Sequence, residues 1–549
     1  MKKSLPLLLS VLLLLAILPM SSTAAEPEST LKIGLYYGNN AMPAANLQNV
    51  SGLPSGYQLG YYNGSRDFVV LYSTGEIYLT VLKDKNIYIG SDKLYYDSLP
   101  SSYNTVIGAY HLQLETAFAS LDEASAKASA LKEAGLSAFV AYTSGGYRVR
   151  TGQYTSSGAA AADAGRVAAA AGVNAAATGE SRSCYTVTVT GSNTILFELD
   201  MGGQPLGIRP NSEKTWFKGQ TYYGGFEYNR VNGNDVTVIN VVHMDDYLKG
   251  VIPYEMSPSW PVEALKAQAL CAKSYAVNSI GKHRSQGFDL CNTTDCQVYY
   301  GTKTATANSD SAVEAVSGLY VTYNGKVAET FYHASSGGWT EDVKNIWGSD
   351  IPYLKAVEDK YLVDTRPYSF SITLDEVTSI LKRKGYNVTE IIDFYASGIT
   401  AAGNVCEVTF VQKNGDNLVF SGDSARTCLN TSGSSKRINS HRYTISTGSK
   451  LYVNDTSLER TAGGYYAIGG GGQVNTTASS GLYAISGDKK IGQVRMTGSG
   501  SGEYFISGTG SGHNIGMSQC GAYAMAQQGF SYEQIIKFYF TGVQVGPAS

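Results

Sequence analysis

Short runs of alternating apolar and polar residues fill the chain after its first 25 residues. Examples between residues 26 and 107 are LKIGLYYG, FVVLYS and IYLTVL, and Gly, Asn and Pro separate these runs. Alternation with a period of two predicts half-buried β-strands, and the separating residues predict turns. A helical bundle is therefore excluded for this part of the chain, and we expect residues 26–107 to form a β-rich N-terminal domain.

The composition indicates an extracellular protein of several domains. The chain has 549 residues, 61 glycines and 41 tyrosines, and only 16% of its residues are charged, against about a quarter in ordinary soluble domains. Its length predicts three to four domains. The net charge of −3 gives no excess of basic side chains to neutralise phosphates, so nucleic acid is excluded as a partner. Tyrosine rings favour a neutral, hydroxyl-rich polymer instead.

Residues 1–25 have the order of a secretory signal peptide. Lys2 and Lys3 precede an apolar stretch from Leu5 to Leu18, and small residues follow at positions 21–25. The stretch is about 14 residues long, whereas a membrane-spanning helix needs roughly 20. We therefore expect a secreted or cell-envelope protein with no permanent membrane span.

Residues 108–190 change to an alternation of strand and helix patterns. YHLQLETAF reads as a strand, ASLDEASAKASALKEAG as a helix that stops at Gly135, and AFVAYTS and YRVRTGQY as two strands. The alanine-rich residues 158–177 predict a second helix, with a flexible linker as the alternative. CYTVTVTG adds the last strand.

This β-α-β-β-α-β order resembles the sporulation-related repeat, a cell-wall module called the SPOR domain. The resemblance covers residues 108–190 and rests mainly on YHLQLETAF and YRVRTGQY. It implies binding to peptidoglycan glycan strands that have lost their stem peptides. No single position identifies the residues that would contact the sugar.

The segment from Val236 to Arg284 carries the strongest candidate for chemistry. A β run ends near Val242, and Pro261 can open a helix that continues to about Ile280. Glu255 lies between these elements in PYEMSP, where we expect a turn rather than regular helix. A carboxyl group in such an apolar, aromatic setting has a raised pKa and can donate a proton near neutral pH. The alternative is a surface-loop glutamate.

Five blocks resemble the stage II sporulation protein D family, secreted peptidoglycan lytic transglycosylases and their amidase-enhancer relatives. They are DDYLKGVIPYEM, EALKAQALCAKSYA, CQVYYG, ETFYHASSGGWTEDVKNIWGSDIPYLKAVED and GSGHNIGMSQCGAYAMAQQGFSYEQIIKFYFTGV. The resemblance implies that Glu255 is the catalytic acid. Where the family usually has Arg, this chain has Lys273, which keeps the charge but loses the bidentate fork.

The same blocks supply the expected substrate-binding residues. Groups on the helix after Glu255 are expected to position sugar hydroxyls or the lactyl carboxylate, and others flank Gly-Ser-rich turns of the kind that bring groups to a ligand. A solvated helix face is the alternative for the lysines, and a structural role is the alternative for the histidines. The expected set is Lys266, Gln268, Lys273, Tyr275, His333, Ser335, Ser336, His513 and Gln519.

Seven cysteines are too sparse for a disulfide scaffold, and their odd number leaves at least one unpaired. Cys291 and Cys296, in LCNTTDCQVYYG, have a spacing that suits a structural zinc ion with His283 as a third ligand, a short disulfide, or two unrelated thiols. Cys406 and Cys428 flank an expected hairpin and are candidates for a structural disulfide.

The sequence thus predicts an α+β, multi-domain protein. Its parts are a signal peptide (1–25), a β-rich domain (26–107), a glycan-binding domain (108–190) and a catalytic domain (191–549). We expect a lytic transglycosylase that forms 1,6-anhydro-MurNAc ends on peptide-free strands and needs no cofactor for catalysis. The alternative is a non-catalytic wall-binding protein that enhances an N-acetylmuramoyl-L-alanine amidase, which is then its partner.

Overall fold

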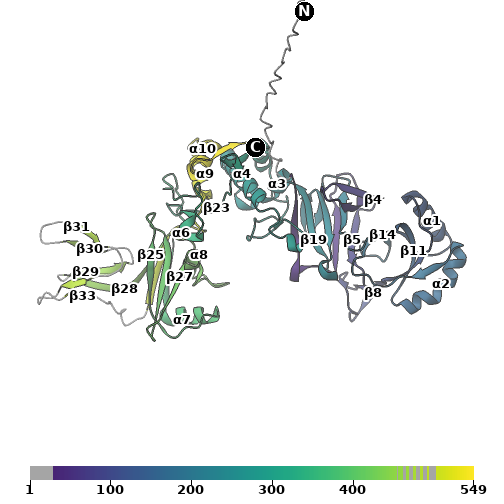
Figure 1. The fold of residues 1–549 in the computed structure, drawn as a ribbon, viewed down its shortest axis with the longest axis horizontal. Coiled ribbons are helices and arrows are strands. Elements are labelled where there is room, and N and C mark those ends of the chain that lie inside the picture. The colour runs from purple at the N-terminus through teal and green to yellow at the C-terminus, as the bar shows by residue number, and fades with distance from the viewer. Residues whose placement is uncertain are drawn as a thin grey trace, which may run out of the picture.

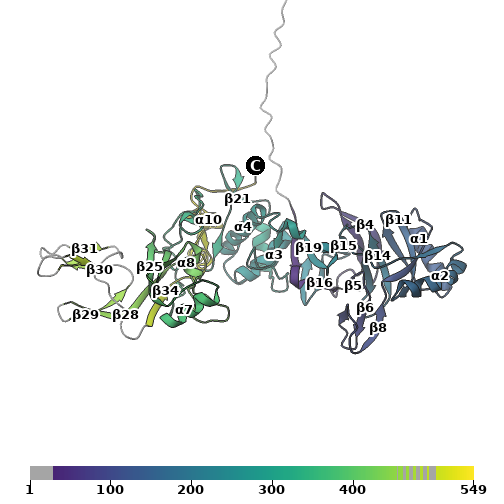
Figure 2. The same ribbon diagram turned by 60° about the horizontal axis from the view of Figure 1, so that its bottom comes forward.

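The computed structural model describes residues 29–548, with gaps at 454–455, 462–464, 469–473, 478–482, 486–490 and 494–502. The signal peptide expected at residues 1–25 lies outside the described residues. The ribbon is elongated, with a strand-rich part carrying α1 and α2 at one end, helices α3, α4, α9 and α10 in the middle and β25–β29 towards the other end (Figure 1). Figure 2 shows the same three parts after rotation. The fold is a mixed α+β arrangement with several sheets, as the sequence predicts.

A seven-stranded sheet forms the base of the middle part, in the order β20-β1-β19-β18-β15-β3-β4. Towards one edge of this sheet β1 and β19 pair antiparallel, with Leu31 on β1 opposite Val242 on β19. The strands are β1 (Thr30–Tyr36), β3 (Tyr57–Tyr62), β4 (Phe68–Thr74), β15 (Leu206–Pro210), β18 (Gly225–Asn229), β19 (Thr237–His243) and β20 (Leu290–Cys291).

A ten-stranded sheet continues towards α1 and α2, in the order β12-β9-β11-β10-β14-β13-β5-β2-β16-β17. Five of its strands come from outside the glycan-binding unit expected at residues 108–190: β2 (Ala44–Asn49), β5 (Tyr78–Lys83), β14 (Ile195–Asp200), β16 (Lys214–Phe217) and β17 (Gln220–Tyr223). A sixth strand, β13 (Tyr185–Val189), lies at the end of that expected range.

Strand pairing joins residues 30–83 to residues 185–243. β1 pairs with β19, β2 with β16, β3 with β15 and β5 with β13, all antiparallel. This arrangement differs from the separate domain expected at residues 26–107, because antiparallel partners can come from distant parts of the chain. Only β6 (Ile87–Gly90), β7 (Tyr95–Tyr96) and β8 (Tyr103–Ile107) form a small sheet among themselves.

The inserted unit has the predicted β-α-β-β-α-β order. Its elements are β9 (Tyr110–Leu114), α1 (Leu121–Glu133), β10 (Ala138–Thr143), β11 (Gly146–Tyr154), α2 (Ser157–Ala171) and β12 (Ala175–Ala177). Side-chain caps from Ser120 and Ser156 begin the two helices, and Gly135 follows α1 in a left-handed conformation. The alanine-rich segment is therefore a helix as far as Ala171, and the linker alternative is wrong, but its last residues form β12 instead of continuing the helix.

The last strand of this unit is not the one that the sequence pattern indicates. β12 closes the unit by pairing with β9, whereas CYTVTV forms β13 and pairs with β14 and β5 of the larger sheet. The three alanines of β12 carry little β propensity, so the apolar CYTVTV segment is the stronger strand pattern. β10 pairs with β14 in parallel, which makes the unit continuous with the rest of the sheet.

A charged cluster is buried where the inserted unit meets the larger sheet. Glu198 on β14 is fully buried, and its two carboxylate oxygens lie 2.8 Å from Arg150 Nη1 and 3.1 Å from His111 Nε2. Thr186 donates a third contact to Glu198 at 3.0 Å. Arg150 also contacts Asp200 at 3.2 Å, so the cluster ties β9 and β11 to β13 and β14.

Five helices pack together beyond β19: α3 (Met244–Glu255), α4 (Val262–Asn278), α5 (Ala307–Ala315), α9 (Gln519–Gln527) and α10 (Tyr532–Tyr539). Most of α4 is buried, including Leu265, Ala269 and Ala272. Pro261 caps its start, in agreement with the predicted opening. Near these helices lie β21 (Tyr320–Tyr323), β22 (Lys326–Val327), β36 (Gln544–Gly546) and α6 (Val343–Trp347).

Glu255 is the last residue of α3, and the expected turn at this position is wrong. The helix includes Pro253, and the backbone leaves helical geometry only at Met256, its C-cap. His243 begins α3 by accepting a bond from the Asp245 amide. Pro253 lies in the last turn of the helix, so its ring and its missing N–H disturb the helix less than they would in the interior.

The end of the molecule opposite α1 and α2 has its own hydrophobic core, formed by residues between Ile372 and Ile506. Its elements include β24 (Tyr368–Thr373), α7 (Leu374–Arg383), β25 (Ile391–Ile399), β26 (Val405–Gln412), β27 (Asn417–Ser421), α8 (Asp423–Thr427), β28 (Tyr443–Val453), β29 (Thr456–Thr461) and β34 (Glu503–Gly508). Short hairpins follow β29, with β30 (Tyr465–Ile468) paired to β31 (Val474–Thr477) and β32 (Tyr483–Ile485) to β33 (Ile491–Gln493). Across the described part of the chain, no helix has the length and apolar character to cross a bilayer.

Candidate functional site

Glu255 ends α3 with a half-buried carboxyl group that two other segments reach. The Val298 N–H lies 3.4 Å from Oε1, and the Gln519 amide Nε2 lies 3.5 Å from Oε2. These are long hydrogen bonds, close to the limit for such contacts. The donors belong to the segment after Cys296 and to α9, so residues far apart in the sequence meet at this carboxyl.

Burial raises the pKa of Glu255 above the ordinary value for glutamate. Hydrogen bonds from Val298, Tyr332 and Gln519 stabilise the carboxylate and oppose this shift in part. All three donors are uncharged, so no neighbouring cation is among the causes of the pKa. The carboxyl therefore keeps a proton to a higher pH than an exposed glutamate does.

A chain of polar side chains holds the donors in place. Gln519 Nε2 also lies 3.4 Å from Gln268 Oε1 on α4. On the other side, Gln297 donates to the Tyr332 hydroxyl at 2.9 Å and accepts from the Tyr247 hydroxyl at 3.0 Å. Gln268 Nε2 is buried and has no hydrogen-bond partner in the described structure, so this amide can still donate to a bound molecule.

A short parallel pair brings two of the sequence blocks to this position. β23 (Tyr332–His333) pairs with β35 (Met517–Ser518), and Gln519 begins α9 directly after β35. Gly512 is required nearby, because its φ is +119° and an added Cβ would lie 2.5 Å from the Cβ of His333. The pairing explains why the FYH and SGH blocks share one site.

Two of the expected sugar-binding residues, Lys266 and Lys273, are engaged within the protein. Lys273 is buried, and its Nζ lies 3.0 Å from both the Asp245 carboxylate and the Val316 carbonyl oxygen. Burial lowers the pKa of Lys273, and the Asp245 carboxylate opposes that shift. Lys266 pairs with Glu263 at 2.8 Å on the partly exposed side of α4.

Tyr275 packs its ring against Phe331, with centroids 6.0 Å apart. Burial raises the pKa of Tyr275. Thus only Gln268 and Gln519 of the expected set lie in the hydrogen-bond chain around Glu255, whereas the lysines and Tyr275 contact other groups.

The rings of His333 and His513 meet edge to face, with centroids 5.4 Å apart. His333 Nδ1 contacts the Ile515 carbonyl at 3.1 Å, and His513 Nδ1 accepts from the Ile515 N–H at 3.0 Å. Burial, followed by nearby positive groups, lowers the pKa of His333 and lowers that of His513 to about 4. Both rings are therefore neutral at pH 7 and are poor candidates for proton donors there.

Ser335 and Ser336 use their hydroxyl groups to hold the fold. The Ser335 hydroxyl donates to the Asp364 carbonyl at 3.1 Å, and the Ser336 hydroxyl donates to Asp359 at 2.7 Å. Asp359 also accepts from the Tyr539 hydroxyl at 2.8 Å, which links this turn to α10. Both serines are fully buried.

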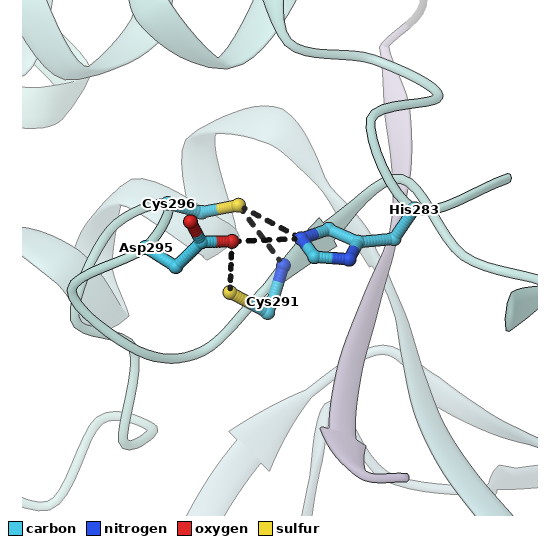
Figure 3. A group of neighbouring side chains, drawn as sticks. All are labelled: His283, Cys291, Asp295 and Cys296. Carbon is cyan, nitrogen blue, oxygen red and sulfur yellow. Dashed lines mark hydrogen bonds and ion pairs between the residues drawn. The ribbon is translucent and has the colours of Figure 1, made fainter. Parts of the chain in front are cut away.

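A second group of side chains lies beside the segment that contacts Glu255. His283, Cys291, Asp295 and Cys296 each offer one ligand atom, and these atoms lie within 4.8 Å of one another (Figure 3). His283 Nε2 is 3.4 Å from Cys296 Sγ and 3.3 Å from Asp295 Oδ2, while Cys291 Sγ is 3.8 Å from Asp295 Oδ2. Two thiols, an imidazole and a carboxylate make a donor set that suits tetrahedral zinc.

The thiols of this group interact rather than forming a disulfide. A hydrogen bond from the Cys296 thiol, followed by contacts from Thr293 and Tyr37, lowers the pKa of Cys291 to about 4 against the opposing effect of burial. The same contact and burial raise the pKa of Cys296. All seven cysteines are free, so the disulfide expected between Cys406 and Cys428 is absent from the described residues.

Sequence reasoning missed four contributors to these sites. Val298, Tyr332 and Gln297 act on or near Glu255, and Asp295 completes the metal-ligand group. All four lie inside or directly beside the CQVYYG and FYHASSGG blocks. The sequence places these residues in or beside the blocks. Which of their atoms face Glu255 depends on the packing of α3 against distant segments.

Comparisons with known proteins identify the same two families that the sequence blocks and the β-α-β-β-α-β order resemble. A family model described as stage II sporulation protein matches residues 232–323, and a SPOR domain model matches residues 107–179. The second range ends at β12, in agreement with the unit that the sheet order defines.

Three curated relatives match between 54% and 60% of this chain. An uncharacterized protein of Brachyspira hyodysenteriae is 30% identical over 60% of this chain and 73% of its own length. The amidase enhancer of Bacillus subtilis is 32% identical over 54% of this chain and 39% of its own length. Stage II sporulation protein D of Bacillus subtilis is 24% identical over 56% of this chain and 75% of its own length.

Proposed function

Because this chain belongs to the stage II sporulation protein D family and contains a SPOR domain, we propose that it is a secreted peptidoglycan lytic transglycosylase. It cleaves the bond between MurNAc and GlcNAc in glycan strands and leaves 1,6-anhydro-MurNAc ends. A role in the cell wall follows from the family and from the relative named amidase enhancer. The specific reaction, lytic transglycosylation, is what we propose beyond this general role.

The observation that carries the proposal is the environment of Glu255. Its carboxyl group is half-buried, has a raised pKa and receives hydrogen bonds only from uncharged donors. Such a group is protonated closer to neutral pH than an ordinary glutamate, as a general acid requires.

One carboxyl group is sufficient for this reaction. Ordinary glycosidases use two, one as acid and the other as base or nucleophile. Here Glu255 donates its proton to the glycosidic oxygen while the bond from that oxygen to C1 of MurNAc breaks. The C6 hydroxyl of the same sugar then forms the new bond to C1, and its proton passes to the Glu255 carboxylate. The acid is thereby restored, no water is consumed, and the attacking group benefits from its high effective concentration.

The amide groups around the carboxyl have complementary roles in this mechanism. Val298 N–H and the Gln519 amide stabilise the carboxylate that exists between the two proton transfers. Gln268 fixes the Gln519 amide and leaves its own buried Nε2 available to a sugar oxygen. The neutral His333 and His513 rings are assigned to shaping the β23–β35 junction rather than to proton transfer.

We further propose that His283, Cys291, Asp295 and Cys296 hold a structural zinc ion. The donor types and their mutual proximity fit such an ion, which would supply cross-linking of the loop and no reaction chemistry. The loop leads directly to Val298, so fixing it fixes the N–H that reaches Glu255. The proton transfers themselves need no metal.

The SPOR unit is proposed to bind peptide-free glycan strands and to bring the enzyme to the wall. Its continuity with the main sheet through β10 and β14 supports a rigid attachment rather than a loose tether. Secretion rests on the leader at residues 1–25, which lies outside the described structure.

A specific observation favours one alternative, a non-catalytic enhancer of a cell-wall amidase. The amidase enhancer relative is 32% identical over its match, a higher identity than that of the stage II sporulation protein D relative. In that case an N-acetylmuramoyl-L-alanine amidase is the partner, and Glu255 has no direct role in bond cleavage.

One experiment separates the two functions. Purified protein is incubated with intact and with peptide-free glycan strands, with and without an added amidase, and the fragments are identified by mass spectrometry. A transglycosylase releases anhydro-ended fragments without amidase. Fragment release only in the presence of amidase, with no anhydro ends, would establish the enhancer function instead.

A further inference from the structure

Two pairs of aromatic side chains include residues close in sequence to Glu255 or to its hydrogen-bond donors, and neither pair has a role in the proposed proton transfers. The rings of Tyr254 and Tyr300 meet edge to face with centroids 5.4 Å apart. The rings of Trp260 and Tyr523 are tilted, with centroids 4.7 Å apart. One ring of each pair lies close in sequence to a different residue that donates a hydrogen bond to the Glu255 carboxyl.

The tyrosine pair lies on the Val298 side. Tyr254 directly precedes Glu255, and Tyr300 lies two residues after Val298, whose N–H reaches Oε1. The Tyr254 hydroxyl donates to the Tyr300 carbonyl oxygen at 3.4 Å. Thr302, two residues further, donates its N–H to the Thr221 carbonyl at 2.8 Å, which holds this segment against β17.

The Trp260–Tyr523 pair lies on the Gln519 side. Tyr523 follows Gln519 by four residues on α9, so both side chains share one face of that helix. Gln527 donates to the Tyr523 hydroxyl at 2.7 Å. Asn308 fixes the loop before α4 by donating to the Trp260 carbonyl at 3.1 Å. The second pair is thus held by α9 and α5.

All four rings keep some exposure to solvent. Tyr300 is 43% exposed, and Tyr254, Trp260 and Tyr523 are half-buried. By contrast, Tyr247 and Tyr299 of the same region are fully buried. Exposed aromatic faces with polar tips suit the apolar faces and hydroxyl edges of sugars.

We infer that the two pairs are sugar-binding subsites on either side of the scissile bond, so that the enzyme takes interior segments of a strand rather than strand ends. The inference rests on the proposed function, because it names the form of that substrate. Val298 and Gln519 approach different oxygens of the Glu255 carboxyl. Each of them lies in the same segment as one ring of an aromatic pair. A strand that contacts both pairs must extend beyond Glu255 in both directions.

Binding is measured with the Glu255→Gln protein and peptide-free strands of defined length, so that cleavage does not disturb the equilibrium. Tyr300→Ala and Tyr523→Ala are each expected to weaken binding of long strands about tenfold. Tyr523→Leu keeps the packing against Trp260 and should weaken binding similarly. The matched control is Tyr103→Ala, because Tyr103 is 49% exposed and makes a similar edge-to-face pair with Tyr88 at 5.1 Å, far from the site in sequence and fold.

Equal binding by the Tyr300, Tyr523 and Tyr103 variants would overturn the subsites. The cleavage pattern tests the interior mode in wild-type protein: early products of intermediate length support it, and stepwise release of disaccharides from one end overturns it. If ring-dependent binding is present but no anhydro product forms, the subsites stand and the proposed reaction fails. If anhydro product forms without ring dependence, the subsites fail and the reaction stands.

Discussion

The fully buried Glu198 and the half-buried Glu255 have opposite pKa shifts. Glu198 lies in the sheet that carries the SPOR unit, and Glu255 lies at the end of α3. Burial acts to raise the pKa of both. At Glu198 the His111 and Arg150 charges outweigh burial and lower the pKa to about 2, whereas at Glu255 only uncharged donors oppose burial, and the pKa is raised.

The comparison shows that burial alone does not make a general acid. Glu198 is paired with cations and remains a carboxylate that links the SPOR unit to the main sheet. Glu255 keeps its proton to a higher pH than an exposed glutamate does. The neighbouring charges therefore decide whether a glutamate that is removed from solvent favours its charged or its protonated form.

The largest expected difference is in activity. Glu255→Gln should lower the cleavage rate by about 10²–10⁴-fold, the usual contribution of a positioned acid–base group. Its thermal unfolding should change little, because the neutral amide replaces a carboxyl that is costly to ionise. Rates are measured by release of soluble fragments, and unfolding by circular dichroism.

Glu198→Gln is the matched substitution in the other region. It should keep the cleavage rate per folded molecule within about twofold, since Glu198 does not contact the site, while unfolding occurs at lower temperature. If Glu198→Gln abolished cleavage in folded protein, or if Glu255→Gln left the rate unchanged, the division between the two glutamates would be wrong.

The second prediction concerns Arg150. Arg150→Met leaves Glu198 buried with one cation fewer, and removal of one partner from a buried pair costs about 3–5 kcal/mol. Chemical denaturation should show this loss in the free energy of unfolding. A control substitution at Arg166, whose pairing with Asp163 is on the exposed surface, should change it by less than about 1 kcal/mol. Equal effects at the two arginines would contradict the role given to the cluster.

Acid should remove the stability that Glu198 contributes, whereas base should remove the activity that depends on Glu255. Glu198 has a folded-state pKa below its unfolded value, so its stabilisation is present above about pH 4.3 and is lost as pH falls towards 2. Glu255 has a raised folded-state pKa, so the acid form is depleted, and activity falls, as pH rises through that pKa.

Denaturation curves and cleavage rates measured across pH test both signs. Glu198→Gln should reduce the loss of stability in acid without moving the high-pH limit of activity. A high-pH limit at or below the ordinary glutamate pKa would contradict the assignment of Glu255 as the acid.

Metal removal should have a smaller effect. If zinc occupies the His283, Cys291, Asp295 and Cys296 group, a chelator should lower the melting temperature by about 3 °C for each kcal/mol of metal stabilisation that is lost. Cys291→Ser should reproduce this, and Cys406→Ser, at a half-buried free thiol elsewhere, should not. The zinc assignment would be wrong if protein purified without chelator lacked zinc and had a disulfide between Cys291 and Cys296.

The smallest effect is expected at Lys266. Its pair with Glu263 is partly exposed, so Lys266→Ala should change the free energy of unfolding by less than about 1 kcal/mol and leave strand binding within twofold. A large loss of binding, measured with the Glu255→Gln protein, would show instead that Lys266 binds the substrate.

Much of the local structure could be predicted from sequence patterns. The helices at residues 121–133 and 262–278, the strands around them and the importance of the blocks near Glu255 all follow from periodicity, caps and resemblance. Strand partners could not be predicted in this way. The pairing of β5 with β13 across the whole inserted unit depends on long-range contacts, and the short β12 has a weak pattern of its own.

The candidate site shows the same division. Glu255 and the Cys291–Cys296 pair stand out because carboxyl and thiol groups in such settings point to chemistry or metal. Lys273 stands out equally, yet its ammonium is buried against Asp245 and Val316. Sequence identifies reactive groups, but the direction in which each side chain points is decided by packing that a linear pattern does not contain.

The most direct test of the account is the identity of the new strand ends. Wild-type and Glu255→Gln protein are incubated with peptide-free strands at neutral pH without amidase, and fragment ends are analysed by mass spectrometry. The account predicts that wild-type protein produces 1,6-anhydro ends, one water lighter than reducing ends, and that the variant produces almost none. Reducing ends from wild-type protein, or anhydro ends formed equally by the variant, would contradict it.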